Sequence, residues 1–152
     1  MDSLQLQSLL SEHFVKQGFS AQPDPALDLD LLLVRDGERL GLLLCPQREE
    51  GMAFLGAFEA AMQRAVDARR AQPEGLDLGL GLAFGSTAAG KRPSYRRALK
   101  KYSSSIVFQD LGLSLYLVHG KDKVLALAPE QVNSFLRGLD GWIAEQTPRH
   151  SS

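Results

Sequence analysis

Six basic residues lie within eleven positions near the middle of the chain, and no acid occurs between Asp77 and Asp110 to neutralise them. The six are Lys91, Arg92, Arg96, Arg97, Lys100 and Lys101. Clustered cations repel one another, so the negative charge of a partner would stabilise them. Three interpretations remain open: the phosphate backbone of a nucleic acid, an acidic protein surface such as the acidic half of another copy, or an ordinary solvated face.

The loop that leads into this cluster has the spacing of a phosphate-binding loop. Gly85, Gly90 and Lys91 match the pattern G-x4-G-K, between a predicted strand and a predicted helix. Arg92, however, stands where that motif places the Ser or Thr that reaches Mg²⁺, and Pro93 lacks a backbone amide for the phosphate. The residues at 92 and 93 therefore favour an ordinary loop of small residues over a loop that binds a nucleotide for hydrolysis. A helix N-terminus with Lys91 and Arg92 would still attract an anion.

Other residues with catalytic or metal-binding potential are sparse. Cys45 is the only cysteine, which fits a reducing cytoplasm, and its place beside Leu44 predicts a buried, unreactive thiol. His13, His119 and His150 do not form a metal-binding set with Cys45. We therefore expect a cytoplasmic protein with no cofactor, no bound metal and no catalytic triad.

Composition sets the broad class of protein. The chain has 152 residues, 44% of them hydrophobic and 23% charged, which is enough to bury one core in a single domain. No apolar run approaches the roughly 20 residues needed to cross a bilayer, so we expect no membrane insertion. The net charge of −1 hides an asymmetry, because residues 1–60 carry 10 acids and 4 bases whereas residues 61–120 carry 9 bases and 4 acids. Such a dipolar chain would orient a charged partner.

Hydrophobic periodicity predicts a mixed succession of helices and strands. Helices are expected over residues 3–16, 51–71 and 94–102, and again from residue 129. Strands are expected over residues 29–34, 40–45, 76–84, 106–108, 113–118 and 123–127, with only a short strand near 18–22. Alternation of helix and strand in the middle of the chain indicates a parallel component. We predict a single three-layer α/β (α+β) domain over residues 1–146, with a mixed sheet flanked by helices, and a flexible tail at 147–152.

Three local patterns bear on how these elements pack. Asp36 and Gly37 supply the positive backbone angles of a tight turn between the first two long strands, whose nearly continuous leucines indicate that both faces are covered. In the strand at 76–84, Gly79 and Gly81 share one face, which predicts close approach of another element. The C-terminal helix carries an apolar stripe with Trp142, which either closes the sheet or contributes a partner surface.

This order of elements resembles the restriction-endonuclease-like fold of the PD-(D/E)xK nuclease superfamily, in its Mrr-type branch. The similarity spans about residues 4–118: an opening helix ends in a Gly-aromatic step at 18–19, and an acidic strand, a charged glycine turn and an apolar strand follow at 28–45. A long helix, a strand and a short basic-aromatic helix complete it at 52–102. The resemblance implies a scaffold on which carboxylates hold Mg²⁺, which activates water and neutralises charge on a scissile phosphate.

In that superfamily a carboxylate sits on the first hairpin strand, and an acid-x-Lys or Gln-x-Lys pair sits near the end of the second. Asp28 and Asp30 would fill the first role in this chain. If the turn is centred on residues 36–37, Asp28 lies opposite Cys45 and Asp30 lies opposite Leu43. The second strand must therefore supply the missing acid and lysine close to these two positions.

Positions 42–47 contain neither an acid nor a lysine. Because Mg²⁺ needs anionic oxygen ligands, one Asp facing apolar residues gives no useful divalent site. Glu49 or Glu50 from the following helix would restore such a site if either reached it, and that alternative stays open. On the simplest interpretation, Asp28 and Asp30 are polar residues at an exposed strand entrance.

The sequence thus predicts a nuclease-like scaffold whose metal site is erased. We expect a non-catalytic protein-interaction or regulatory module that docks into a larger bacterial assembly, on a protein partner or on a second copy. The alternative is a nucleic-acid-binding protein or a residual metal-dependent nuclease that uses the basic cluster at 91–101.

Overall fold

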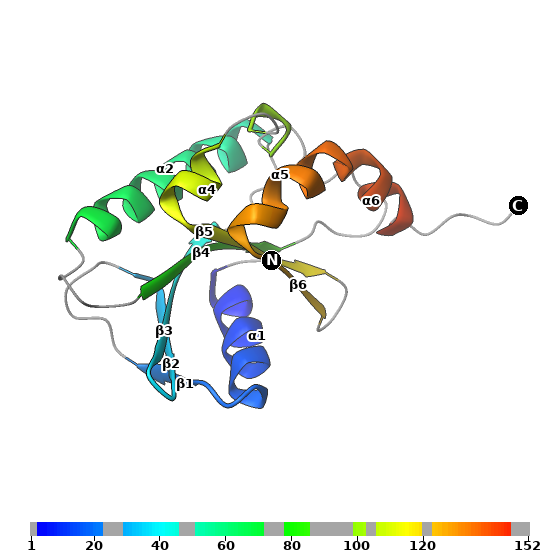
Figure 1. Ribbon diagram of the computed structural model, residues 1–152. Helices are drawn as coiled ribbons and strands as arrows, with labels where there is room; N and C mark the ends of the chain where they lie inside the picture. Colours follow the sequence, from blue (N-terminus) through cyan, green and yellow to red (C-terminus); the bar gives the residue numbers. More distant parts are fainter. Residues whose placement is uncertain are drawn as a thin grey trace, which may run out of the picture.

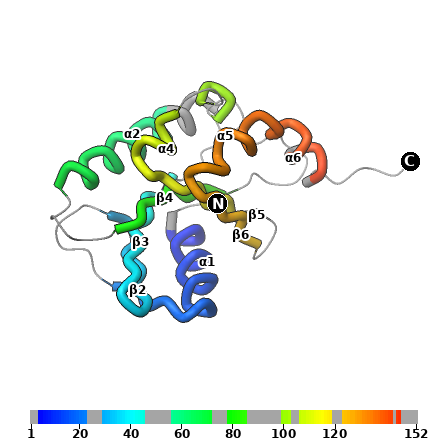
Figure 2. The backbone as a smooth tube through the Cα atoms, in the orientation of Figure 1, coloured from blue at the N-terminus to red at the C-terminus, as the bar shows by residue number. Residues whose placement is uncertain are grey.

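A six-stranded sheet separates two helical layers in the computed structural model of the chain (Figure 1). The structure describes residues 3–22, 29–45, 51–71, 78–85, 99–102, 106–119 and 123–146. Figure 2 draws the same backbone as a smooth tube. Strands that are neighbours in the sheet are also successive strands of the sequence. The predicted α/β class with a mixed sheet is confirmed.

The six strands pair in chain order, from β1 to β6. They are β1 (Ser20–Gln22), β2 (Leu31–Arg35), β3 (Glu38–Cys45), β4 (Leu78–Gly85), β5 (Leu113–His119) and β6 (Lys123–Leu127). The central strands β3, β4 and β5 run parallel, whereas β1, β2 and β6 pair antiparallel with their neighbours. Helical connections join the parallel strands, because a tight turn can join only antiparallel ones.

The helices are divided unequally between the two faces of the sheet. They are α1 (Ser3–Lys16), α2 (Gly51–Ala71), α4 (Val107–Leu111), α5 (Pro129–Arg137) and α6 (Leu139–Gln146). Among the described helices, α1 is the one that covers the first face, and α2, α4, α5 and α6 gather on the other (Figure 1). The first helix and the long second helix have the bounds that their apolar spacing predicts.

The β2–β3 hairpin forms because its two turn residues accept the backbone angles that a tight turn needs. Asp36 has φ 44° and Gly37 has φ 86°, the positive values of the predicted turn. Arg35 pairs with Glu38 across this turn, and the same register continues to Leu31 beside Leu42. Extended by one residue, it places Asp30 opposite Leu43, as the sequence predicts.

Two apolar cores hold the layers together. The core under α2 contains Phe58, Phe84 and Phe108, each at most 1% exposed, and the ring of Phe58 packs on the other two. The core under α1 is built on Leu6, Leu10 and Phe14 of α1 and on leucines of β2 and β3. Each fully buried side chain of this size contributes about 1.5–3 kcal/mol, and the core under α2 contains more of them than the core under α1.

The predicted close approach at the β4 glycines is confirmed at Gly81. A Cβ atom at Gly81 would lie 2.5 Å from Cε2 of Tyr116, so the tyrosine ring occupies the space that a side chain would fill. A Cβ at Gly79 would meet only ordinary contacts, at 3.5 Å from the Arg39 carbonyl oxygen and from Leu40. The face of β4 toward α1 therefore has room at one glycine and none at the other.

The prediction of a strand at residues 106–108 is wrong, because this segment begins α4. Ile106 and Val107 are β-branched and favour a strand locally. Burial of Phe108 and a left-handed Gly112 that ends the helix (φ 62°) override that preference. Arg69 of α2 fixes this end, since its guanidinium donates to the carbonyl oxygens of Leu111 (2.9 Å) and Gly112 (3.1 Å).

The C-terminal helix is interrupted rather than continuous. It divides at Gly138 into α5 and α6, while Val132, Leu136 and Leu139 of the predicted stripe are buried on both sides of the break. Trp142 is partly buried against the core and packs on Phe135, with ring centroids 5.5 Å apart. This stripe therefore helps to close the sheet. Of the helix predicted at 94–102, residues 99–101 are helical and Tyr102 lies in a turn, whereas residues 94–98, like the tail at 147–152, lie outside the described residues.

Candidate functional site

Asp30 is the candidate metal ligand that the structure describes, and its carboxylate already has three donors. Its Oδ2 accepts the backbone N–H of Leu44 at 2.8 Å and an N–H from Nη1 of Arg64 at 3.0 Å. Its Oδ1 accepts an N–H from Nη2 of Arg64 at 3.2 Å. The guanidinium thus grips the carboxylate with both of its terminal nitrogens, which is the strong, geometrically specific form of this ion pair.

Arg64 reaches this position because α2 lies along the sheet beside the end of the hairpin. The side chains of Asp30 and Arg64 are 31% and 32% exposed, so water screens the pair only in part. A divalent cation at Asp30 would have to displace a positive charge that is already bound or lie close to it. The arrangement therefore disfavours a metal ion at the carboxylate for an electrostatic reason that the sequence does not reveal.

The surroundings of Asp30 on β3 are apolar, as its register predicts. Leu43 and Cys45 are fully buried. Burial raises the pKa of the Cys45 thiol to about 12, with a smaller contribution from the negative charge of Asp30. Such a thiol is a poor metal ligand and a poor nucleophile at neutral pH. The prediction that Cys45 is buried is confirmed, and its low reactivity stays a prediction.

The other carboxylates that the sequence offers for this site, Asp28, Glu49 and Glu50, lie outside the described residues. Within the part of the chain that the structure describes, no three His, Cys, Asp or Glu side chains come close enough together to hold a metal ion.

Two members of the basic cluster are described, and both have acidic partners within the fold. Lys101 binds Glu59 of α2, with Nζ and Oε1 2.9 Å apart, and Lys100 forms an ion pair with Asp140 of α6. The hydrogen bond between Lys101 and Glu59 lowers the pKa of Glu59 and raises the pKa of Lys101, as expected for an ion pair. Lys91, Arg92, Arg96 and Arg97 lie outside the described residues, as does the loop from residue 86 onward.

These pairings change how the basic cluster is interpreted. The sequence lacks an acid near Lys100 and Lys101, but the fold brings acids to them from helices about 40 residues away in either direction. Leu99 is fully buried and Tyr102 is partly buried, so both side chains of this segment face the core. The hydroxyl of Tyr102 donates to the same Glu59 carboxylate at 3.4 Å. The two described lysines thus have carboxylates near them without any partner molecule.

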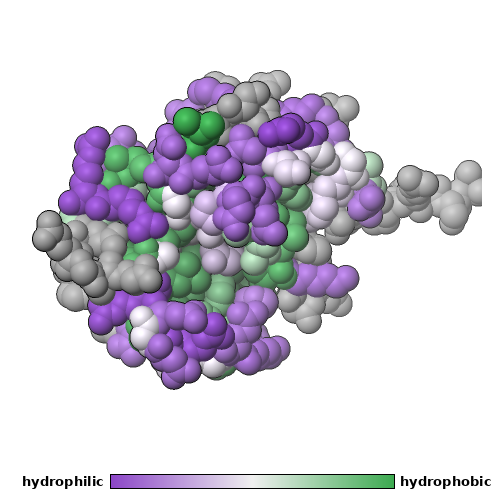
Figure 3. All heavy atoms as spheres, in the orientation of Figure 1, coloured by the Kyte–Doolittle hydropathy of each residue, from purple (hydrophilic) through white to green (hydrophobic). Residues whose placement is uncertain are grey.

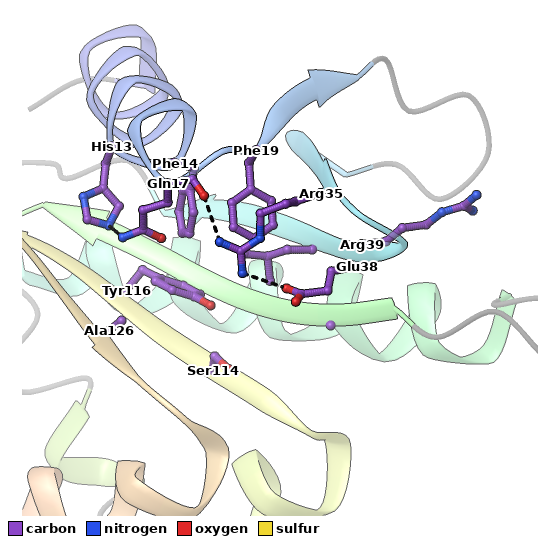
Figure 4. Close-up of a pocket in the computed structure, with 12 residues that line it drawn as sticks. His13, Phe14, Gln17, Phe19, Arg35, Glu38, Arg39, Ser114, Tyr116 and Ala126 are labelled. Carbon is purple, nitrogen blue, oxygen red and sulfur yellow. Dashed lines mark hydrogen bonds and ion pairs between the residues drawn. The ribbon is translucent and has the colours of Figure 1, made fainter.

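A pocket on the α1 face of the sheet was not predicted from the sequence. It has a volume of about 480 Å³ and lies between the C-terminal end of α1, the β2–β3 hairpin and the open ends of β4, β5 and β6 (Figure 4). Its lining residues are His13, Phe14, Gln17, Phe19, Arg35, Glu38, Arg39, Leu40, Gly79, Ser114, Tyr116 and Ala126. Most of the described apolar surface visible in Figure 3 lies in the band between α1 and the opposite helical layer.

Arg35 is the central charged group of this pocket (Figure 4). Its Nη1 donates to the carbonyl oxygen of Gln17 at 2.8 Å, its Nη2 lies 3.2 Å from Oε2 of Glu38, and its guanidinium carbon lies 4.3 Å from the centroid of the Phe19 ring. The contact with Gln17 also satisfies a carbonyl just beyond the end of α1. In Figure 4 the Arg39 side chain points away from this group.

The remaining polar groups of the pocket come from α1 and β5. The amide nitrogen of Gln17 lies 3.1 Å from Nε2 of His13, whose pKa is lowered by partial burial and by the charge of Lys16. Burial raises the pKa of Tyr116, so its hydroxyl remains protonated at neutral pH. Two arginines, one carboxylate and several neutral polar groups therefore line the pocket.

Comparison with known proteins gives no match: no family model, curated protein or solved structure matches the chain. Among the described residues, no helix is both long enough and apolar enough to cross a membrane.

Proposed function

We propose that the chain is a non-catalytic interaction or regulatory module on a nuclease-like scaffold, which docks on a protein within a larger bacterial assembly in the cytoplasm. The order of α1, β2, β3, α2 and β4 supports the scaffold, because it agrees with the layout that suggested the nuclease superfamily. A protein surface, including that of a second copy, is the partner that this proposal requires.

The bidentate contact between Arg64 and Asp30 carries the proposal. A metal-dependent nuclease uses its carboxylates to hold a cation that activates water and neutralises the scissile phosphate. At Asp30 the guanidinium of Arg64, held by two hydrogen bonds, supplies the positive charge instead. A guanidinium has no coordination site for water, so it balances the carboxylate without providing a nucleophile.

The alternative proposal, a nucleic-acid-binding protein or residual nuclease that uses the cluster at 91–101, depends on cations that are available to phosphates. Lys100 and Lys101 are held by carboxylates, which lowers their expected contribution to the binding of nucleic-acid phosphates. The proposal of a protein partner is therefore the one that the described contacts favour.

A cleavage and binding assay tests this choice. Supercoiled DNA and single-stranded RNA are incubated with the protein and Mg²⁺ or Mn²⁺, and binding of both nucleic acids is measured at two salt concentrations. We expect no cleavage and no salt-sensitive binding. Metal-dependent cleavage that is lost in Asp28→Ala or Asp30→Ala would overturn the proposal.

Charge reversal distinguishes the alternative. Salt-sensitive binding that is lost when Arg96, Arg97, Lys100 and Lys101 are replaced by Glu would establish the nucleic-acid function and contradict ours. Replacement of Arg39, Arg70, Lys123 and Arg137 by Glu provides a matched control, because it reverses four exposed positive charges on other described elements.

A further inference from the structure

We propose that the pocket beside the C-terminal end of α1 binds a small carboxylate with an apolar or aromatic body, through the guanidinium of Arg35. This inference is independent of the Asp30 corner and of the proposed function. It rests on the size of the cavity, on the way Arg35 is held and on the residues that leave the cavity open.

The cavity has the dimensions of a small-molecule site. Its volume of about 480 Å³ lies within the range typical of ligand pockets, about 300–1,000 Å³. Its surface combines aromatic side chains with a few polar groups from different elements, which is also typical of such sites. The body of a ligand would lie beside the rings of Phe19 and Tyr116.

Arg35 is oriented before any ligand binds. The carbonyl oxygen of Gln17 accepts from one terminal nitrogen, and the ring of Phe19 supports the guanidinium plane. These contacts restrict the rotation of a long side chain, so a ligand would lose less conformational freedom on binding. An arginine fixed in this way favours a planar anion that accepts two hydrogen bonds, and a carboxylate is such an anion.

Glu38 shows which chemical group fits the guanidinium. Its carboxylate lies 3.2 Å from Nη2 of Arg35, but its side chain is 64% exposed. It makes this contact across the hairpin turn, as an exposed ion pair of small net energy. A ligand carboxylate that also gained burial of its apolar body would therefore replace Glu38 at little cost.

The floor of the cavity is open because three neighbouring strands place small residues on the α1 face. They are Gly79 of β4, Ser114 of β5 and Ala126 of β6. A valine at Gly79 would start from a Cβ with ordinary contacts at 3.5 Å, so the backbone tolerates it while its methyl groups enter the cavity. This position allows the pocket to be filled without change to any charged residue.

Binding is tested with benzoate, and benzamide serves as an uncharged analogue of nearly the same shape. Titrations are followed by two-dimensional NMR at the Gln17 side-chain amide, the Arg35 side-chain N–H and the Ser114 backbone amide. We expect saturable shifts at these three groups with benzoate, and at least about tenfold weaker binding of benzamide, because the ligand charge is lost. Equal binding of the two compounds, or no saturable shift with benzoate, would overturn the proposal.

Two variants with matched controls test the site itself. Gly79→Val should abolish benzoate binding, whereas Gly56→Val, which adds the same side chain on α2 where nothing lies within 4 Å, should leave it unchanged. Glu38→Gln should tighten binding about two- to fivefold by removing the competing carboxylate. Glu12→Gln removes one negative charge beside Lys16 instead and should have no such effect. Retained binding in folded Gly79→Val would contradict the assigned site.

The carboxylate can belong to a free metabolite or to the end of a polypeptide. A short peptide that ends in phenylalanine with a free carboxylate, titrated beside its C-terminal amide, distinguishes the two sources. Tighter binding of benzoate than of the peptide acid assigns a small-molecule site. Tighter binding of the peptide acid, lost in its amide and in Gly79→Val, assigns the same site to a chain terminus.

Discussion

The two ends of the β2–β3 hairpin each carry an arginine–carboxylate pair, and the two pairs differ in how firmly they are held. At one end, Arg64 grips Asp30 with two nitrogens, and the backbone N–H of Leu44 adds a third hydrogen bond to the same carboxylate. At the other end, Arg35 is fixed by its own neighbours, but its partner Glu38 makes a single contact and is largely exposed. The same two chemical groups thus form a firmly held pair at Asp30 and, at Arg35, a pair in which a ligand carboxylate could replace Glu38.

The difference follows from where each carboxylate lies in the fold. Asp30 precedes β2 and faces α2, so its charge is partly removed from water and needs fixed donors. Glu38 lies at a hairpin turn and is mostly exposed, so water would solvate its charge even if the contact with Arg35 were lost. Burial therefore decides which pair contributes to stability and which pair can change its partner.

The largest effect expected at the closed end concerns Cys45. A thiol pKa of about 12 instead of 9.0 lowers the thiolate fraction at neutral pH about a thousandfold, and full burial slows reaction further. Alkylation by iodoacetamide, followed by mass spectrometry, should therefore be at least about a thousandfold slower in the native protein than in urea. Rapid native alkylation would show that solvent reaches this corner.

The same raised pKa predicts a loss of stability in alkali. The unfolded thiol ionises near pH 9 and the folded thiol near 12, so the stabilising contribution is complete below pH 9 and is lost as the pH rises toward 12. Cys45→Ala should reduce this part of the alkaline dependence in urea unfolding measured at several pH values.

The two glycines of β4 sharpen the contrast on the pocket side. Gly81→Val should lower the free energy of unfolding by about 2–3 kcal/mol, because the new Cβ would overlap the Tyr116 ring. Gly79→Val should change it by less than about 0.5 kcal/mol, because the strand there is open. Urea unfolding of both variants measures the difference. Equal destabilisation would mean that the floor of the pocket is not open.

Removal of one partner from each hairpin end compares the two pairs directly. Arg64→Met should cost about 2 kcal/mol, because it leaves the partly buried carboxylate of Asp30 without its cation, a loss reduced by the one-third exposure of the pair. Glu38→Gln should cost less than about 1 kcal/mol. Asp30→Asn combined with Arg64→Met should recover part of the first loss, as measured by urea unfolding. Equal costs at the two ends would remove the distinction.

The hairpin and the register of Asp30 were predictable because local chemistry fixes them. Asp36 and Gly37 specify the turn, and the turn specifies which residues face each other across β2 and β3. The helices at 3–16 and 51–71 follow from apolar spacing in the same way. Helix α4 was not predictable from apolar spacing, because burial of Phe108 and the Gly112 cap outweigh the local strand preference of Ile106 and Val107.

The partners of the candidate residues were not predictable from the sequence. Arg64 lies 34 residues from Asp30, and Glu59 lies 42 residues from Lys101, so both pairings depend on how α2 lies across the sheet. The pocket collects residues from one helix, five strands and the segment that follows α1, and their common face becomes visible only once the strand order is known. Alternation of small residues in β4 was the available signal, and it indicated close approach without indicating a cavity.

The claim that Arg64 takes the place of a divalent cation at Asp30 is tested most directly by Mn²⁺. The ion is titrated into the wild-type protein, and paramagnetic broadening is followed at the backbone amide of Leu44, whose hydrogen bond ends on the Asp30 carboxylate. We predict no broadening of Leu44 beyond that of amides on the far side of the sheet. Selective, saturable broadening of Leu44 that disappears in Asp30→Asn would show that the carboxylate binds metal and would contradict the claim.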